Sequence, residues 1–286
     1  MYHIEEDIRD SAQLIISTFG GLSSLKNKKR TLTIGTDVHS RQQSYTEGSG
    51  TSARFHKITG FLQLKGTPKI IAVDSGNHCL RKLSTLNNEF FSETFAGRCM
   101  QSGSDDGHLH TSRFFEPYNI IEGFFEDEYY VTDTRNHAIR LIILKNSSVV
   151  TIKTLANWEQ PRGIALDRTT KTLLVTVGLS NKVEILKMDI SGNNVNRLKV
   201  REFVRSYVVS FRVIKNILFL NPETYIIADW GGGKLWRLKL SGNSTEAIAK
   251  EMSNVSYPLS MALSERKDKL YVGERGSIQA FSVTGM

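Results

Sequence analysis

Short apolar stretches recur along this chain in one arrangement: an alternating run, a polar turn, and a second alternating run. The two clearest copies, "PKIIAVDSGNHCLRKL" and "DEYYVTDTRNHAIRLI", occupy residues 68–83 and 127–142. Weaker copies occupy residues 171–186, 223–238 and 268–283. β-branched and aromatic residues fill the runs, and Gly, Asn or Asp fill the turns, which predicts antiparallel hairpins. No segment shows the periodicity of an amphipathic helix.

A further short strand precedes each hairpin and another follows most of them, so the repeating unit has four antiparallel strands. Units of this kind that recur at roughly 45–60 residues are typical of β-propeller blades. We therefore predict an all-β fold in which residues 1–286 form a single propeller domain. The expected blades span residues 55–97, 114–157, 158–204, 207–252 and 257–283.

Closure of the ring is suggested by the two ends of the sequence. The last unit stops before its fourth strand, while "AQLIISTFGG" near the first residues supplies a strand without a blade. We expect residues 13–19 to complete the last blade and close a five-bladed ring, because this pairing removes two exposed strand edges. A six-bladed ring with one unusual blade is the alternative.

The turns of the first two hairpins repeat the pattern Asp-x-x-Asn-His, followed by an arginine. An Asp at a strand end can accept hydrogen bonds from the next backbone N–H groups, and Asn tolerates the left-handed conformation of a tight turn. Equivalent histidines on successive blades lie apart on a ring, so we interpret the motif as turn structure rather than as a metal site. The structural turn residues are Asp74, Asn77, His78, Arg81, Asp133, Asn136, His137, Arg140 and Asp229.

The turn sequences "VDSGNHCLRKL" and "VTDTRNHAIRLI" closely resemble the NHL repeat, named after Asn-His-Leu at this position. Residues 95–120, which contain "FAG", "GSDDG" and "SRFFEP", are similar to the segment between blades of many NHL repeats. The resemblance is specific for the first two units and weaker for the others. It implies a β-propeller but no single activity, because NHL propellers include RNA binders, protein-binding modules and a few lyases.

The chain has two cysteines, Cys79 and Cys99. If the hairpin turns near Asn87 and Asn88, they face each other across antiparallel strands, where Cβ atoms are about 4.5–5.5 Å apart. A disulfide needs a Cβ–Cβ distance of about 3.5–4.5 Å, so the two strands would have to approach only slightly. Two free thiols that face each other by chance are the alternative. The pairing also resembles a cysteine-bearing NHL subtype of large extracellular animal proteins. We therefore expect a disulfide and an extracellular or cell-surface location, within a longer protein, rather than a cytoplasmic one.

In a propeller of this topology, the turns between second and third strands share one face with the connections between blades. Basic and aromatic side chains on that face are expected to form a binding platform, although solvated loops and core-covering tryptophans would have the same composition. The net charge of +8 favours an acidic or polyanionic partner. The candidate binding residues are Lys26, Lys28, Lys29, Arg30, Arg98, Arg135, Trp158, Arg162, Trp230 and Lys234.

Enzyme chemistry has little support in the sequence. The strands expected near the axis bring one carboxylate, Glu122, and no histidine, so two-carboxylate hydrolysis and His-based metal sites lack their groups. We expect no catalytic residues, metal or cofactor, and no membrane insertion, because no apolar run approaches roughly 18 residues. The favoured function is a non-enzymatic module that binds a protein or glycan. An RNA-binding propeller is the alternative, and a metal-dependent lyase or hydrolase ranks third.

Overall fold

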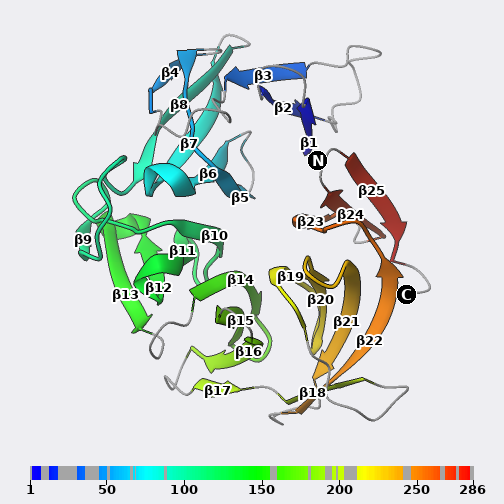
Figure 1. The fold of residues 1–286 in the computed structure, drawn as a ribbon. Helices are drawn as coiled ribbons and strands as arrows, with labels where there is room; N and C mark the ends of the chain where they lie inside the picture. Colours follow the sequence, from blue (N-terminus) through cyan, green and yellow to red (C-terminus); the bar gives the residue numbers. More distant parts are fainter. Residues whose placement is uncertain are drawn as a thin grey trace.

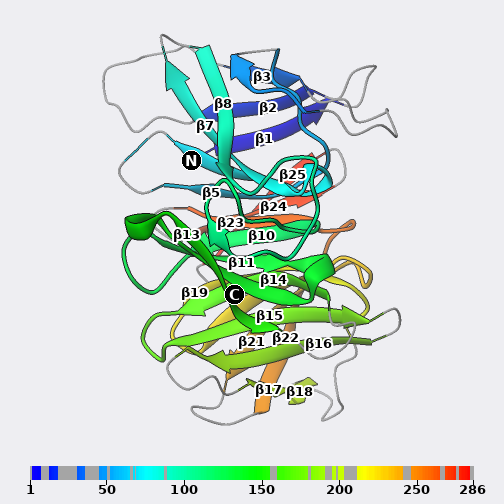
Figure 2. The ribbon, with the colours of Figure 1, turned by 90° about the vertical axis from the view of Figure 1, so that its left-hand side faces the viewer.

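The computed structural model shows a ring of antiparallel sheets around a central axis, seen end-on in Figure 1 and from the side in Figure 2. This all-β architecture is the predicted β-propeller. The described part of the chain contains no α-helix and therefore no helix that could span a membrane. The described residues are 2–7, 13–18, 31–35, 45–49, 52–64, 67, 69–86, 89–154, 160–179, 182–190, 195–197, 199–202, 211–240, 246–264, 268–274 and 277–283.

Each of the five predicted units forms its own antiparallel sheet. Blade one contains β5 (Ile58–Gln63), β6 (Ile70–Asp74), β7 (Cys79–Leu86) and β8 (Glu89–Ala96), with β4 (Gly48–Ser49) along its outer edge. Blade two contains β10 (Pro117–Glu122), β11 (Glu128–Asp133), β12 (Ala138–Ile143) and β13 (Ser148–Thr154), with β9 (Gly107–His108) outermost. Three-residue 3₁₀ turns follow β6, β11 and β12, at Ser75–Asn77 (η2), Thr134–Asn136 (η3) and Leu144–Asn146 (η4).

The remaining blades continue the ring in sequence order. Blade three contains β14 (Gln160–Asp167), β15 (Thr172–Leu179), β16 (Lys182–Asp189) and β17 (Val195–Arg197). Blade four contains β19 (Ile214–Asn221), β20 (Thr224–Asp229), β21 (Lys234–Leu240) and β22 (Glu246–Asn254). Blade five contains β23 (Ser260–Leu263), β24 (Lys269–Glu274) and β25 (Ser277–Ser282).

The outer strand of blade three is shorter than the sequence predicted. Only β17 pairs with β16, while β18 (Lys199–Glu202) pairs in parallel with β22 of blade four. The chain thus crosses to the next blade inside the segment 158–204 that we had assigned to blade three. The physical reason is that an outer strand has one open row of backbone N–H and C=O groups, and β22 offers that row to the passing chain.

The N-terminal strand does not close the ring in the predicted way. β2 (Gln13–Thr18) lies between β1 (Tyr2–Asp7) and β3 (Thr31–Gly35) in a separate three-stranded sheet. Since both edges of β2 are occupied, it is not the outer strand of blade five. The sheet lies between blade five and blade one, with β1 near β25 (Figure 1). Pairing with neighbours in the sequence closes short loops, which costs less entropy than joining distant segments.

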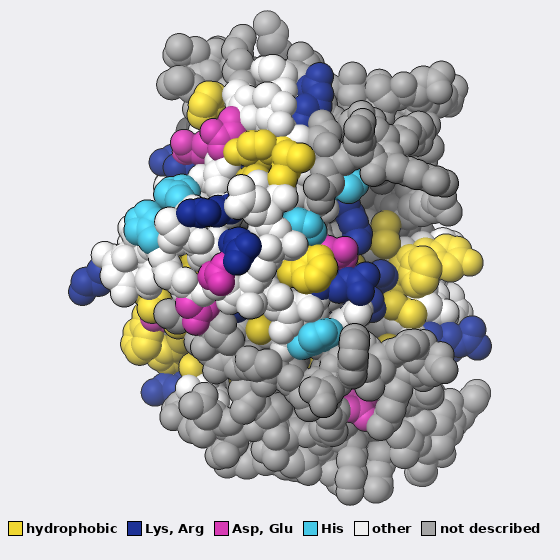
Figure 3. Space-filling view, turned by 60° about the vertical axis from the view of Figure 1, so that its left-hand side comes forward, with side chains coloured by type: hydrophobic (Ala, Val, Ile, Leu, Met, Phe, Trp, Pro, Cys, Tyr) yellow, Lys and Arg dark blue, Asp and Glu magenta, His cyan; other side chains and the backbone are white. Residues whose placement is uncertain are grey.

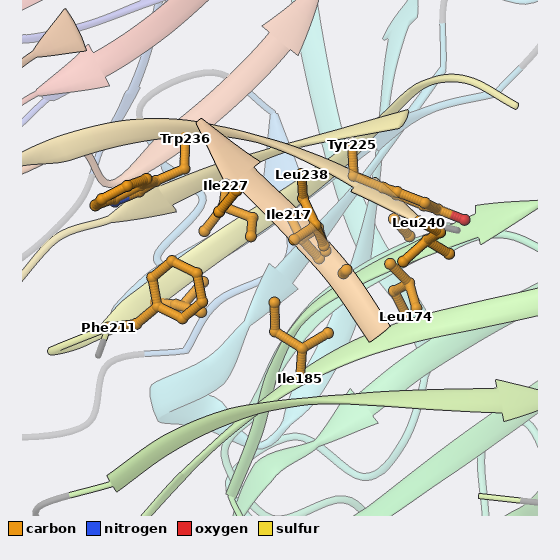
Figure 4. Close-up of a cluster of buried hydrophobic side chains, with 13 residues drawn as sticks. Leu174, Ile185, Phe211, Ile217, Tyr225, Ile227, Trp236, Leu238 and Leu240 are labelled. Carbon is orange, nitrogen blue, oxygen red and sulfur yellow. The ribbon is translucent and has the colours of Figure 1, made fainter. Parts of the chain in front are cut away.

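The hydrophobic core lies mainly between adjacent blades. The cluster shown in Figure 4 joins Leu174 and Ile185 of blade three to Tyr225, Trp236 and other residues of blade four. Comparable clusters join blades one and two, blades two and three, and blades four and five. A smaller cluster lies within blade one and the segment that enters it. Most of the described core is therefore shared between adjacent blades.

The innermost strands pack closely because glycine allows it. A Cβ on Gly163 of β14 would lie 2.9 Å from the Ile217 nitrogen of β19, and one on Gly60 of β5 would lie 3.0 Å from the Tyr118 carbonyl of β10. The first distance is shorter than real Cβ contacts, and the second is at their lower limit. The two glycines therefore let neighbouring innermost strands approach one another around the axis.

Candidate binding face

The Asn-His turns and the first residues of the innermost strands lie at the same end of the ring. The strand register shows this through three pairs, Ile58 with Asp74, Pro117 with Asp133, and Ile214 with Asp229. We call this end the turn face. It comprises the turns at residues 74–79, 133–138 and 229–234 together with the starts of β5, β10, β14, β19 and β23. The sequence assigned its basic and aromatic candidates to this face.

The first turn is organised around the buried carboxylate of Asp74. This group accepts hydrogen bonds from the His56 backbone N–H at 2.8 Å and from the Asn77 side chain at 2.9 Å. Arg81, which is also fully buried, donates to Asp74 at 3.4 Å. Further contacts of the Arg81 guanidinium are hydrogen bonds to the carbonyls of Arg54 and Thr46 and the hydroxyl of Ser92, and stacking on the rings of Tyr45 and Phe55.

The second turn repeats this network one blade further on. Asp133 accepts from the Phe115 backbone N–H at 2.8 Å, from Asn136 at 2.8 Å and from Arg140 at 2.7 Å. Further contacts of Arg140 are the carbonyls of Arg113 and Asp105, the carboxylate of Asp106 and the ring of Phe114. In both blades the arginine therefore holds the segment that enters its own blade.

The two buried carboxyls are costly to desolvate. Burial raises the pKa of Asp74 and of Asp133 to about 6, although hydrogen bonds and the neighbouring arginines oppose the shift. Burial also lowers the pKa of Arg81. Both carboxylates are ionised at neutral pH, so each turn contains a buried ion pair, and removal of either partner takes the buried counter-charge away from the other.

The roles inside the turn differ from those we predicted. The histidine takes the left-handed conformation, with φ of 61° at His78 and 54° at His137, whereas we had assigned that conformation to the asparagine. The asparagine amide instead donates to the aspartate, which fixes it inside the 3₁₀ turn. The aspartates of the first two blades accept from a backbone N–H 18 residues upstream rather than from the next residues.

Blade four builds its turn without the asparagine or the histidine. Asp229 accepts hydrogen bonds from the backbone N–H groups of Val213 at 3.0 Å and Gly232 at 3.1 Å. Gly233 supplies the left-handed position, with φ of 63°. The aspartate thus does the same work in all three turns: it ties the strand end to the segment that enters the same blade.

His78 connects blade one to the segment that enters blade two. Its Nδ1 accepts a hydrogen bond from the Glu116 backbone N–H at 3.2 Å, and its ring packs edge-on against Phe115. Burial lowers the pKa of His78, which favours the neutral ring that this acceptor role requires. Within the described ranges, no group of His, Cys, Asp and Glu side chains is arranged to hold a metal ion.

Cys79 and Cys99 form the disulfide that we predicted, with Cα atoms 5.0 Å apart. Leu86 pairs with Glu89, so the β7–β8 hairpin turns where the sequence indicated. Beyond the bridge, the backbone N–H of Met100 donates to the Asn77 carbonyl at 2.7 Å. The disulfide therefore fastens the segment between blades one and two to the first turn.

The structure describes half of the candidate binding residues. Lys26, Lys28, Lys29, Arg30 and Trp158 lie outside the described residues. Arg98, Arg135, Arg162, Trp230 and Lys234 lie within them, and Arg98 is exposed just after β8.

Two of the described candidates have carboxylate partners. Arg135 lies 3.6 Å from Glu116, and Lys234 lies 2.6 Å from Glu251. In Figure 3, acidic side chains are likewise interspersed among the Lys and Arg side chains. The described surface is therefore a mixture of charges rather than one basic patch.

β-bulges modify the first four innermost strands just inside the turn face. The extra residue is Thr59 in β5, Tyr118 in β10 and Lys215 in β19, and the bulge of β14 contains Arg162 and Gly163. A bulge interrupts the regular alternation and redirects a side chain. Because the four bulges occupy equivalent positions on successive blades, they bring these residues around the axis.

The contacts of Lys215 show that residues at the bulges of different blades lie close together near the axis. Its Nζ lies 5.3 Å from the ring centroid of Trp230 and 5.7 Å from that of Tyr118. Tyr118 belongs to blade two and Lys215 to blade four, and blades that are not neighbours in the ring come this close near the axis. We use the term axial cluster for Lys57, Tyr118, Arg162, Lys215 and Trp230.

The axial cluster is electrostatically strained. Burial lowers the pKa of Lys215 to about 8, and the nearby charges of Arg162 and Lys57 act in the same direction. Burial also raises the pKa of Tyr118 to about 12, so its hydroxyl stays protonated. The axial cluster therefore places three positive charges near two aromatic rings.

Sequence reasoning found Arg162 and Trp230 but missed Lys57, Tyr118 and Lys215. Lys215 and Tyr118 lie at bulges, where the strict alternation of a strand assigns a side chain to the wrong face of the sheet. The available signal was the position of both residues at the start of a first strand. Glu122, the carboxylate we expected near the axis, pairs with Arg168 at 3.5 Å and lies at the opposite end of β10.

No protein-family model matches the sequence, and no curated protein matches it significantly. Solved structures do share its fold. A chain in the crystal structure of a nidogen/laminin complex superposes with a TM-score of 0.65 at 12% identity, over 98% of this chain and 88% of the other. A Bacteroides thetaiotaomicron protein of unknown function gives a TM-score of 0.63 at 12% identity, over 98% and 70%.

Enzymes also occur among the similar structures. A virginiamycin B lyase from Staphylococcus aureus superposes with a TM-score of 0.53 at 11% identity, over 100% of this chain and 85% of the other. At such identities the similarity establishes the β-propeller fold alone. Binding modules and enzymes share the fold, so the function has to be argued from the turn face itself.

Proposed function

We propose that this chain is a non-enzymatic β-propeller of the NHL type and that its turn face binds a protein partner. The observation that carries the proposal is an aromatic pair beside the axial cations. Trp230 packs against Tyr257 with ring centroids 5.4 Å apart, and Tyr257 is 56% exposed. Trp230 is partly exposed, and Trp, Tyr and Arg are the residues that most often dominate protein interfaces. The two Asn-His turn sequences support the NHL assignment.

A protein partner is favoured over RNA because of the charge arrangement. RNA binding without sequence preference needs a continuous groove of cations along the phosphate backbone. On the turn face, Glu116 and Glu251 accompany Arg135 and Lys234. Among the described cations without a carboxylate partner, Arg162 and Lys215 lie near each other at the axis, next to the rings of Tyr118 and Trp230.

We propose an extracellular or cell-surface location for this module. The Cys79–Cys99 disulfide supports it, since such bonds persist in oxidising compartments. Peptide mass spectrometry under non-reducing conditions, on protein from its native source, tests the proposal. We expect one cross-linked peptide pair, and two unpaired thiols would contradict the location.

The binding proposal is tested with an array of secreted and cell-surface ectodomains probed with the purified full chain. For a genuine partner, we expect Trp230→Ala/Tyr257→Ala to weaken binding about tenfold or more. Phe125→Ala is the matched control, because Phe125 is 66% exposed at the β10–β11 turn on the opposite face.

Two results would contradict the binding proposal. One is a set of partners that bind the double variant and the wild type equally, which would place the interface elsewhere. The other is the absence of a protein partner together with strong RNA binding that falls steeply with salt, as release of counterions predicts. That second result would favour the RNA-binding alternative.

A further inference from the structure

Two cations of the axial cluster, Arg162 and Lys215, have no carboxylate partner within the described part of the chain. The guanidinium of Arg162 donates to the Gln160 side-chain oxygen at 3.2 Å, and Lys215 contacts the faces of Tyr118 and Trp230. By contrast, Lys57 of the axial cluster and Arg135 and Lys234 of the turn face have Glu116 or Glu251 within 3.6 Å. The described residues thus provide no carboxylate that compensates the positive charges of Arg162 and Lys215.

This arrangement has an energetic consequence. Lys215 is half-buried, and Arg162 and Lys57 repel its positive charge, so its ammonium group is less stable than in water. An anion seated between Arg162 and Lys215 would reverse that penalty, since opposite charges attract more strongly where water is partly excluded. The two aromatic rings beside Lys215 provide the partly dry surroundings.

We propose that Arg162 and Lys215 bind a carboxylate of an acidic peptide segment on the protein partner, while Trp230 and Tyr257 pack against an apolar residue next to it. This inference rests on the proposed function and names the chemistry of the partner at that site. The ligand group is a single carboxylate, because Arg162 lies near enough to Lys215 to repel its charge and both residues stand at bulges of innermost strands. Glu116, beside Lys57 and Arg135, opposes a second anionic group on that side.

An acidic peptide accounts for the aromatic residues better than a phosphate polymer does. Tyr257 lies next to Trp230 and is flanked on the surface by Leu259, which is 39% exposed. A surface that combines two cations with an exposed apolar patch suits a segment in which acidic and apolar side chains alternate. Its described residues contain no continuous row of cations that would track a nucleic acid backbone.

The test uses a dye-labelled peptide of alternating Glu and Leu, measured by fluorescence anisotropy with the full chain. We expect binding at low salt, and a loss of about tenfold or more in Lys215→Met and in Arg162→Gln. Lys239→Met is the matched control, because Lys239 is exposed at the other end of β21. The same peptide with every Glu replaced by Gln is expected to bind weakly. Each variant's melting temperature shows that it is folded.

Several outcomes would overturn the inference. Equal losses in Lys215→Met and Lys239→Met would indicate non-specific attraction to net charge. Equal affinity for glutarate and for the peptide would assign the site to free small carboxylates instead. Preferred binding of a single-stranded RNA would replace the peptide by a nucleic acid.

The inference can fail while the proposed function survives. If an ectodomain partner loses binding in Trp230→Ala/Tyr257→Ala but binds Lys215→Met as well as the wild type, the turn face binds a protein without the carboxylate contact. If every turn-face variant binds the partner normally, both proposals fail. Normal binding by Lys239→Met and Phe125→Ala is expected in either case.

Discussion

At the scale of single residues, Lys215 combines an ordinary position near the start of a strand with an unusual environment. The bulge at the start of β19 turns it to the axis, where it lies over two rings and near two other cations. Groups whose pKa is shifted by burial and by named neighbours tend to occur at functional sites. Its presence there is costly for folding, and the cost can be measured.

We expect Lys215→Met to raise the melting temperature at neutral pH. The pKa of Lys215 in the fold is about 8, below its ordinary value of 10.5, so the unfolded chain holds this proton more tightly. The resulting destabilisation is complete below about pH 8 and disappears as the pH rises past about 10.5. The stabilising effect of the variant should shrink over that interval, as followed by thermal unfolding at several pH values.

Lys239→Met is the control for this prediction, because it removes the same charge from an exposed position. We expect it to change the melting temperature little. A Lys215→Met protein that melts below the wild type, or a difference that does not depend on pH, would contradict the assigned environment of Lys215.

At the scale of elements, the Asn-His turn links the end of a blade's second strand to the segment that precedes its first strand. The aspartate receives the upstream backbone N–H, and the arginine on the third strand reaches both the aspartate and the entry loop. Blades one and two contain the complete device, and blade four keeps only its aspartate and a glycine. The first two blades therefore depend most on buried charge.

We expect Asp133→Ala to lower the free energy of unfolding by about 3 kcal/mol, because it removes the buried charge partner of Arg140 and leaves only the exposed carboxylate of Asp106. Glu126→Ala is the control, since Glu126 is exposed in the same blade and surface substitutions change stability within about 0.5 kcal/mol. Denaturant unfolding measures both. Equal stability of the two variants would show that Arg140 finds other partners.

The disulfide acts at the same scale, on the β7–β8 hairpin and the loop beyond it. We expect Cys79→Ser/Cys99→Ser to lose about 3 kcal/mol of stability, the amount that chain entropy gives for a loop of this length. Denaturant unfolding of the oxidised wild type and of the variant gives the difference. The reduced wild type should resemble the variant, and an unchanged unfolding midpoint would mean that the bridge constrains little.

At the scale of the whole molecule, the ring is held by cores between blades, so each blade is stable only beside its neighbours. The sheet of β1, β2 and β3 lies between blades five and one and extends this arrangement. A gap in such a ring exposes strand edges and apolar faces on both sides of the gap, which favours aggregation.

Deletion of residues 2–18 should therefore lower the melting temperature and promote aggregation. It removes β1 and β2 and leaves β3 without its partner. Deletion of residues 2–7 removes only the edge strand β1, and we expect a smaller effect. Thermal unfolding and size-exclusion chromatography distinguish the cases. If the longer deletion stays monomeric and melts as the wild type does, the N-terminal sheet contributes nothing to ring stability.

The sequence by itself determined the propeller fold, the five repeated units and the disulfide. These features depend on local patterns: alternating residues define strands, and turn residues set where each hairpin reverses. The hairpin turn near residues 87 and 88 brought Cys99 close to Cys79, although the strand register ends at Leu80 and Ala96 and the bridge forms just beyond it. The partner of the segment 13–18 did not follow, because many strand edges in a ring are chemically equivalent and a hydrophobic pattern does not choose among them.

Only the tertiary structure decided which side chains meet at the axis. Tyr118, Arg162 and Lys215 are separated by about one blade each in sequence, and no spacing rule joins them. They come together because the blades are arranged in a ring and because a bulge in each of their three strands shifts the alternation by one residue. The left-handed histidines were missed for a related reason: the asparagine amide is taken up by a buried aspartate, a contact that exists only once the chain is folded.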